Sequence, residues 1–165
     1  MNKPSDSRST GTRRAALCLA AMAGLGMTSP SAVADTQADE HKHVRGGQKI
    51  ILTMTDGRQA RATLLDNATA RTFATTLPLV VRMGDHFGRE LYGPMPSMPV
   101  SDPLQKTYRA GDIAYWPPAP GFAIYYTVGG PVIPGDGIAL LGAIDTNLDL
   151  FSHGSTVVTI ELAKE

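Results

Sequence analysis

The stretch from residue 111 to residue 128 is the feature that most constrains how this chain can fold. It contains the only tryptophan of the chain and three of its five tyrosines. Two runs rich in β-forming residues flank the Pro/Gly-rich segment 117–121, a pattern that predicts a wide β-hairpin. Because side chains alternate along a strand, Phe122, Ile124 and Tyr126 are expected to share one face. The sequence therefore predicts a domain with a β core around this hairpin.

Other short segments carry the same β pattern and are separated by turn residues. The expected strands cover residues 48–55, 58–65, 79–83, 89–92, 111–116, 122–128, 138–144 and 156–162. Asp56-Gly57 separates the first two, a pair that predicts a hairpin with a type I′ turn. Eight short strands of this kind are typical of a closed barrel or a sandwich.

One segment has helical rather than β periodicity. Residues 68–77 place apolar side chains three and four positions apart, which predicts an α-helix with one buried face. Asp66 or Asn67 is the expected N-cap, and Pro78 is expected to end the helix. Short helical turns are expected in 145–154. The overall prediction is an all-β fold with one clear α-helix.

The segment 94–99 contains three prolines at close spacing, which excludes a helix or a central strand. It is expected to be extended and to lie on the surface. Met95 and Met98 could cover an apolar edge of the barrel, since methionine fills irregular gaps well. The alternative is that Met95 contacts a ligand, so this residue is kept as a candidate.

The first 34 residues resemble a secretory signal peptide. Basic residues that include Arg13 and Arg14 precede an uncharged, Ala/Leu/Gly-rich run, which ends in Ala32-Val33-Ala34. The arginine pair favours a twin-arginine signal, and ordinary secretion is the alternative. Either route predicts a periplasmic or secreted protein. Glycine and proline interrupt the apolar run, so no permanent membrane span is expected after cleavage.

Cleavage would leave a polar linker, residues 35–47, and a domain, residues 48–165. It would remove four of the 15 basic residues but only one of the 15 acidic ones, leaving a mildly acidic protein. This balance argues against nucleic acid as a partner. The only cysteine, Cys18, would be lost with the signal, which excludes disulfides and cysteine chemistry. The four histidines lack metal-ligand spacing, so no metal or other cofactor is expected.

Four segments of the chain form a recognisable series. They are Asp-Asn-Ala-Thr-Ala-Arg-Thr-Phe (66–73), Leu-Pro-Leu (77–79), Gly-Asp-Ile-Ala-Tyr-Trp-Pro-Pro (111–118) and Leu-Gly-Ala-Ile (141–144). In this order they resemble the bacterial cyclophilin-like proteins. The resemblance extends over about residues 48–163. It implies a closed eight-stranded barrel capped by helices, similar to the prolyl isomerases called cyclophilins. Residues 83–87 depart from the Phe-x-Met-x-Gln type of signature that the isomerases carry after their catalytic arginine.

Two functions are compatible with these observations. The first is a non-catalytic domain that binds a peptide or small ligand in a groove beside the 111–128 hairpin, because clustered rings suit such grooves. Its candidate contacts are Tyr115, Trp116, Phe122, Tyr125, Tyr126 and Met95. The second is a peptidyl-prolyl isomerase acting on exported proteins. There Arg82 would favour the twisted amide, and the alternative for Arg82 is a surface ion pair.

Hydrolase and phosphate-binding functions are not supported by the sequence. His86 follows Asp85, and His153 precedes a glycine and a serine, but no Gly-x-Ser-x-Gly nucleophile motif is present. The glycine-rich segments 129–131 and 135–137 lack the lysine and the following helix of a phosphate loop. These segments are expected to be turns.

Overall fold

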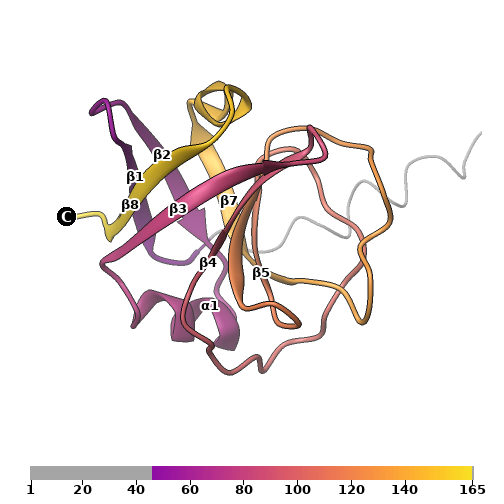
Figure 1. The fold of residues 1–165 in the computed structure, drawn as a ribbon. Helices are drawn as coiled ribbons and strands as arrows, with labels where there is room; N and C mark the ends of the chain where they lie inside the picture. Colours follow the sequence, from indigo (N-terminus) through magenta and orange to yellow (C-terminus); the bar gives the residue numbers. More distant parts are fainter. Residues whose placement is uncertain (1–45, 165) are drawn as a thin grey trace, which may run out of the picture. The chain divides into compact units, whose positions relative to one another are not determined.

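The computed structural model describes residues 46–164, and they form a closed antiparallel barrel of eight strands (Figure 1). The strands are β1 (Lys49–Met54), β2 (Gln59–Leu64), β3 (Leu79–His86), β4 (Glu90–Pro94), β5 (Asp112–Trp116), β6 (Gly121–Tyr125), β7 (Ala139–Thr146) and β8 (Thr156–Leu162). Around the barrel they follow the order β1-β2-β7-β5-β6-β4-β3-β8. The all-β prediction with eight strands is confirmed, whereas the expected signal peptide and most of the linker lie outside the described residues.

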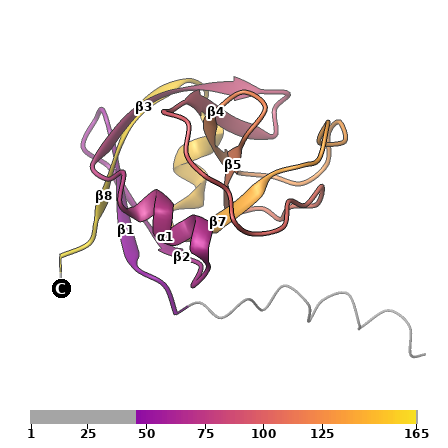
Figure 2. The ribbon, with the colours of Figure 1, turned by 90° about the horizontal axis from the view of Figure 1, so that it is seen from below.

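Two short helices lie at opposite ends of the barrel. The helix α1 (Ala68–Ala74) lies across one opening, as the view from below shows (Figure 2). A 3-10 helix, η1 (Leu148–Ser152), lies at the other end (Figure 1). Asn67 caps α1 by accepting a hydrogen bond from the backbone N–H of Ala70 at 2.7 Å, which supports one of the two expected caps. No helix of the described chain is both long and apolar enough to span a bilayer.

The turn of the first hairpin differs from the prediction. The N–H of Met54 donates to the Arg58 carbonyl at 2.8 Å, and the N–H of Gly57 donates to the Met54 carbonyl at 2.9 Å. Only Gly57 has a positive φ in this turn, 84°, whereas a type I′ turn requires two such residues. The predicted type I′ turn is therefore wrong, and the loop is a three-residue turn closed by a glycine bulge.

The strand β3 is longer than expected. The sequence placed a turn at residues 84–88, but the strand continues through His86 and pairs there with Glu90 of β4. The turn is confined to the next residues, where Phe87 and Gly88 have φ values of 59° and 62°. This extension carries His86 and Phe87 to the mouth of a pocket on the outside of the barrel.

The β-strands bury side chains on two separate sides. The barrel interior contains Phe73, Tyr115 and Phe122, and the rings of Phe73 and Phe122 are stacked with centroids 5.4 Å apart. A second, smaller cluster lies outside the barrel wall, and its buried members are Ala114, Ala123, Tyr125, Ile133 and Ile138. All five residues of β6 are buried as a result. The loop 126–138 and the segment 105–108 supply the cover for the outer face of β6.

Candidate functional site

The second cluster encloses a cavity, here called the outer pocket, with a volume of about 250 Å³. It lies against the outer faces of β4, β5 and β6, under the loop 126–138. The lining residues are His86, Phe87, Arg89, Glu90, Tyr92, Trp116, Ala123, Tyr125, Ile133, Pro134 and Ile138. The pocket thus combines aromatic and aliphatic walls with one pair of charged residues, a composition typical of small-molecule and side-chain binding sites.

Aromatic rings form a continuous wall on one side of the outer pocket. The ring of His86 contacts Phe87 edge to face, with centroids 5.5 Å apart, and lies 5.4 Å from the ring of Tyr92. Tyr92 in turn meets Trp116 edge to face at 6.1 Å. The series begins at Phe87, which is 71% exposed, so it leads from solvent to the barrel wall.

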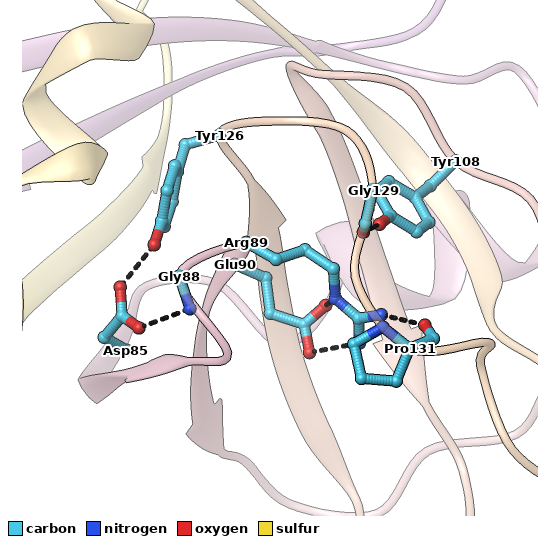
Figure 3. A network of polar contacts seen from close by, with 8 residues as sticks. All are labelled: Asp85, Gly88, Arg89, Glu90, Tyr108, Tyr126, Gly129 and Pro131. Carbon is cyan, nitrogen blue, oxygen red and sulfur yellow. Dashed lines mark hydrogen bonds and ion pairs between the residues drawn. The ribbon is translucent and has the colours of Figure 1, made fainter.

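A buried ion pair lies beside this wall. The guanidinium of Arg89 donates from Nε to one carboxylate oxygen of Glu90 at 3.0 Å and from a terminal nitrogen to the other at 3.1 Å. Its remaining nitrogen donates to the carbonyl of Pro131, so the guanidinium lies between the carboxylate and the loop (Figure 3). Burial alone lowers the pKa of Arg89, but the hydrogen bonds and charge of Glu90 outweigh it and raise the pKa overall.

Two tyrosine rings pack next to the guanidinium. Tyr108 and Tyr125 are stacked with ring centroids 4.0 Å apart. The guanidinium carbon Cζ of Arg89 lies 5.4 Å from the first centroid and 5.8 Å from the second. These are cation–π distances. Burial, together with the nearby carboxylate of Glu90, raises the pKa of Tyr125, so its hydroxyl stays neutral.

The loop that covers the outer pocket is attached to the barrel at two points. Arg89 holds the Pro131 carbonyl, and the hydroxyl of Tyr108 donates to the Gly129 carbonyl (Figure 3). Ile133 then packs into the second cluster and is only 3% exposed. The loop is therefore held over the pocket by side chains from the segment before β4 and the segment before β5.

The indole of Trp116 contributes an unsatisfied donor. Its Nε1 atom is the only buried side-chain nitrogen or oxygen in the described part of the chain that has no hydrogen-bond partner. Leaving a buried N–H unpaired costs roughly 1–3 kcal/mol, so most such groups in folded proteins are paired. Less than 1 Å² of this atom is accessible, so the N–H is buried beside the outer pocket rather than open to it.

A further polar contact lies near the pocket mouth. The hydroxyl of Tyr126 donates to the carboxylate of Asp85, which also accepts from the N–H of Gly88 at 2.9 Å (Figure 3). These bonds lower the pKa of Asp85. Burial, followed by the bond to Asp85, raises the pKa of Tyr126 to about 12. The pair fastens the turn after β3 to the end of β6.

The structure brings together some of the predicted ligand contacts and separates others. Trp116 and Tyr125 line the outer pocket. Tyr115 and Phe122 point into the barrel interior, where they are 1% and 0% exposed, and Met95 is buried in the same core. Tyr126 packs against that core and bonds to Asp85, as described above. The hairpin 111–128 thus divides its aromatic rings between the interior and the pocket.

Arg82, the predicted catalytic residue, lies elsewhere. Its side chain is exposed, and it pairs with Val157 in the part of β3 that borders β8. The outer pocket forms further along β3, where the strand borders β4. Arg82 is not among the residues that line the pocket, so its position gives the isomerase hypothesis no support.

Several pocket residues were not identified from the sequence. Arg89 and Glu90 form an adjacent pair of opposite charges where the strand β4 begins, and Tyr92 follows on the same face as Glu90. Because side chains alternate along a strand, this spacing was the sequence signal that could have placed Glu90 and Tyr92 side by side. Ile133 gave no local signal, because it lies in a Gly/Pro-rich segment that resembles any surface turn.

Other cavities in the described domain include polar groups that already have partners. One of about 400 Å³ borders α1 and includes Asp102, whose carboxylate accepts from the N–H of Thr69 at 2.7 Å. Another, of about 570 Å³, includes Lys49 and Asp145, which form an ion pair at 3.5 Å. Residues 46–164 contain no group of three or more histidine, cysteine or acidic side chains placed to hold a metal ion.

Comparisons with known proteins agree with the barrel. The solution structure of a hypothetical protein from Archaeoglobus fulgidus superimposes with a TM-score of 0.55 at 16% sequence identity, covering 71% of this chain and 95% of that one. At this identity the likeness shows the fold alone. No curated protein sequence matches the chain. The family described as the Cyclophilin-like family matches residues 53–161, and the chain therefore belongs to the cyclophilin-like family.

Proposed function

We propose that this protein is an exported binding domain that takes up a peptide side chain or a small ligand in the outer pocket, without catalysing a reaction. The observation that carries the proposal is an apolar cavity of about 250 Å³ on the outside of the barrel, lined by rings that include Tyr92 and Trp116. A preformed apolar pocket with few polar groups is the usual form of a ligand site. The charged groups in its wall, Arg89 and Glu90, bond to each other, and Arg89 also bonds to the Pro131 carbonyl.

Binding is tested with a screen of fragments and short peptides, measured by thermal shift and ligand-observed NMR. A ligand that binds only the folded state raises the melting temperature in a saturable way. We expect hits with wild type and loss of these hits in Ala123→Leu, because Ala123 is 2% exposed and lines the pocket. Arg82→Ala is the matched control, since this exposed side chain lies outside the pocket, and it should bind like wild type. A flat response across both libraries would contradict the proposal.

A prolyl isomerase is the second candidate, because the apolar cavity of about 250 Å³ has room for a proline ring. Exchange NMR on a proline-containing peptide separates the two functions. Under our proposal the cis–trans exchange rate stays at the uncatalysed value, even at peptide concentrations that saturate the pocket. Acceleration that disappears in Ala123→Leu but survives in Arg82→Ala would favour the enzyme instead.

Export is tested on the N-terminal sequence. A chain produced with its natural N-terminus in a bacterium should appear in the periplasm or medium cut after Ala34, as N-terminal sequencing would show. Replacing Arg13 and Arg14 by lysines blocks the twin-arginine route and leaves ordinary secretion intact. Retention of the uncut chain in the cytoplasm of both versions would contradict the proposed location.

A further inference from the structure

We infer that residues 128–137, here called the lid, open and close over the outer pocket and thereby control the entry and release of its ligand. This inference rests on the proposed function and specifies how access to that site is regulated. Three features lead to it: the attachment of the lid, the apolar side chain that it buries, and the conformation of its glycines.

Backbone hydrogen bonds fix the chain on either side of the lid. The N–H of Thr127 donates to the Arg89 carbonyl at 3.3 Å. At the other end, Ile138 and Gln105 form a β-bridge with two backbone hydrogen bonds of 2.8 and 2.9 Å. Both ends therefore belong to the barrel, so the segment between them can move without disturbing the strands.

Two side-chain hydrogen bonds, here called the latches, hold the lid down between these ends. The guanidinium of Arg89 donates to the Pro131 carbonyl, and the hydroxyl of Tyr108 donates to the Gly129 carbonyl (Figure 3). Both acceptors are main-chain oxygens of the lid, whereas both donors lie outside it. A single hydrogen bond changes an equilibrium about two- to tenfold, so the loss of one latch should measurably increase opening.

Ile133 is the side chain with which the lid closes the pocket. It is the only buried residue among residues 128–136, and it belongs to the second cluster and lines the outer pocket. Val128 and Val132, by contrast, are 65% and 80% exposed. A surface segment with few buried apolar contacts opens more readily than the core. Opening requires Ile133 to leave the cluster, while the barrel interior stays packed.

Glycines with positive φ lie on both sides of Ile133. Gly129 and Gly130 have φ values of 95° and 86°, and Gly135 has a φ value of 64°. Glycine adopts positive and negative φ about equally well, so the backbone can rotate at these positions at little cost. The hinges of ligand-site lids are a few residues that absorb such changes. The lid thus has a hinge on each side of its buried side chain.

Methyl NMR on the full chain, labelled at the isoleucine δ1 carbons, tests the lid without any ligand. The outer pocket contains several aromatic rings, so the methyl shift of Ile133 differs between the closed and the open lid. Lid motions occur on the microsecond-to-millisecond timescale, which relaxation dispersion detects. We expect dispersion at Ile133 and none at Ile124, which is fully buried in the barrel interior.

Two variants with matched controls increase opening by different means. Tyr108→Phe removes one latch and should raise the open population about fivefold, whereas Tyr126→Phe removes a hydroxyl outside the lid and should leave it unchanged. Gly129→Ala strains the closed lid and should raise the open population about tenfold, because a Cβ there meets no atom within 4 Å and only the positive φ opposes it. Gly57→Ala places the same strain in the first hairpin, where φ is 84°, and is its control.

Benzene tests whether opening controls entry. An apolar cavity of about 150 Å³ holds benzene, and the outer pocket has about 250 Å³. Line-shape analysis of the Ile133 methyl should show benzene binding and leaving about fivefold faster in Tyr108→Phe, with Kd unchanged because the closed lid remains the major form.

Two results would overturn this inference and leave the proposed function intact. One is an Ile133 methyl without exchange in wild type and in both lid variants. The other is equal benzene rates in wild type and Tyr108→Phe despite increased opening, which would show that ligand enters past Phe87 instead. If neither benzene nor any molecule of the fragment and peptide screen binds, the proposed function itself fails, even where the lid opens.

Discussion

The guanidinium of Arg89 and the carboxylate of Glu90 form two hydrogen bonds, of 3.0 and 3.1 Å, although the residues are neighbours in the sequence. Neighbouring side chains on a regular strand point to opposite faces. These two meet because Arg89 belongs to the turn and β4 begins at Glu90. The pair is buried, and it also holds the loop over the outer pocket through Pro131.

Breaking this pair should destabilise the domain strongly. Glu90→Gln leaves the buried guanidinium without a counter-charge, and removal of one partner of a buried pair typically costs about 3–5 kcal/mol. Replacing both residues, in Arg89→Met with Glu90→Leu, removes both charges and should recover most of that loss. Chemical denaturation of Arg89→Met, Glu90→Leu and the double variant measures the difference. Additive losses in the double variant would show that the two side chains act independently.

Gly93 and Gly121 differ in what an added methyl group would meet. A Cβ at Gly93 would lie 2.4 Å from a side-chain carbon of Val81 and 2.5 Å from the backbone oxygen of Arg82. The three atoms nearest a Cβ at Gly121 would all belong to the side chain of Tyr92, at 2.2–2.4 Å. Backbone cannot move aside, whereas a partly exposed ring can.

We therefore expect Gly93→Ala to be the more destabilising of the two variants, beyond the 1–3 kcal/mol that is typical of overpacking. Gly121→Ala should cost less but displace the ring of Tyr92, breaking its hydrogen bond to the Ala119 carbonyl, 2.6 Å in length. It should also weaken ligand binding, because Tyr92 lines the outer pocket. Denaturation and the NMR screen measure both effects, and equal stability losses would contradict the explanation.

The sequence predicted the barrel well because its signals are local. The strand alternation and the cap at Asn67 each depend on a few adjacent residues, and the structure contains eight strands at about the expected places along the chain. The β3 extension was missed because Gly84 suggests a turn when it is read alone. Its pairing with Tyr92 across the hairpin keeps it in the strand.

The site could be predicted only in part, because it depends on contacts between distant segments. Trp116 and Tyr125 were identified as rings in a half-buried hairpin. The sequence could not show that β6 is covered on both sides, since the cover comes from Ile133 and Ile138 in a separate loop. Without that information, Phe122 and Tyr125 were equal candidates, although only the second reaches the outer pocket.

The Tyr126–Asp85 contact should make stability depend on pH at both ends of the range. The pKa of Asp85 is lowered, first by the Tyr126 hydroxyl, so its contribution is present above the ordinary value near 3.9 and is lost as the pH falls through the lowered pKa. The pKa of Tyr126 is raised to about 12, so its contribution is present below the ordinary value near 10 and is lost as the pH rises from there to about 12.

The variant Tyr126→Phe tests this pH dependence. It removes the hydroxyl, so the free energy of unfolding should lose part of its decline in both acid and alkali relative to wild type. Denaturation from pH 2 to pH 12 gives the free energy of unfolding against pH for both proteins. Burial raises the pKa of Tyr125 and of Tyr92 in both, so their contribution in alkali cancels when one curve is subtracted from the other. Parallel curves for the two proteins would show that the contact is not maintained in solution.

Phe122 and Ala123 are adjacent on β6 and point to opposite sides of the barrel wall, so they separate fold stability from binding. Phe122 is fully buried against Phe73, and Phe122→Ala should cost about 3–5 kcal/mol through lost burial and the cavity that remains. At a temperature where this variant is still folded, the affinity of any screening hit should match wild type, because the side chain faces away from the outer pocket. Ala123→Leu should show the reverse, with binding lost and most of the stability retained. If Phe122→Ala abolished binding in the folded state, ligand would have to enter the barrel interior, and the outer pocket would no longer be the site.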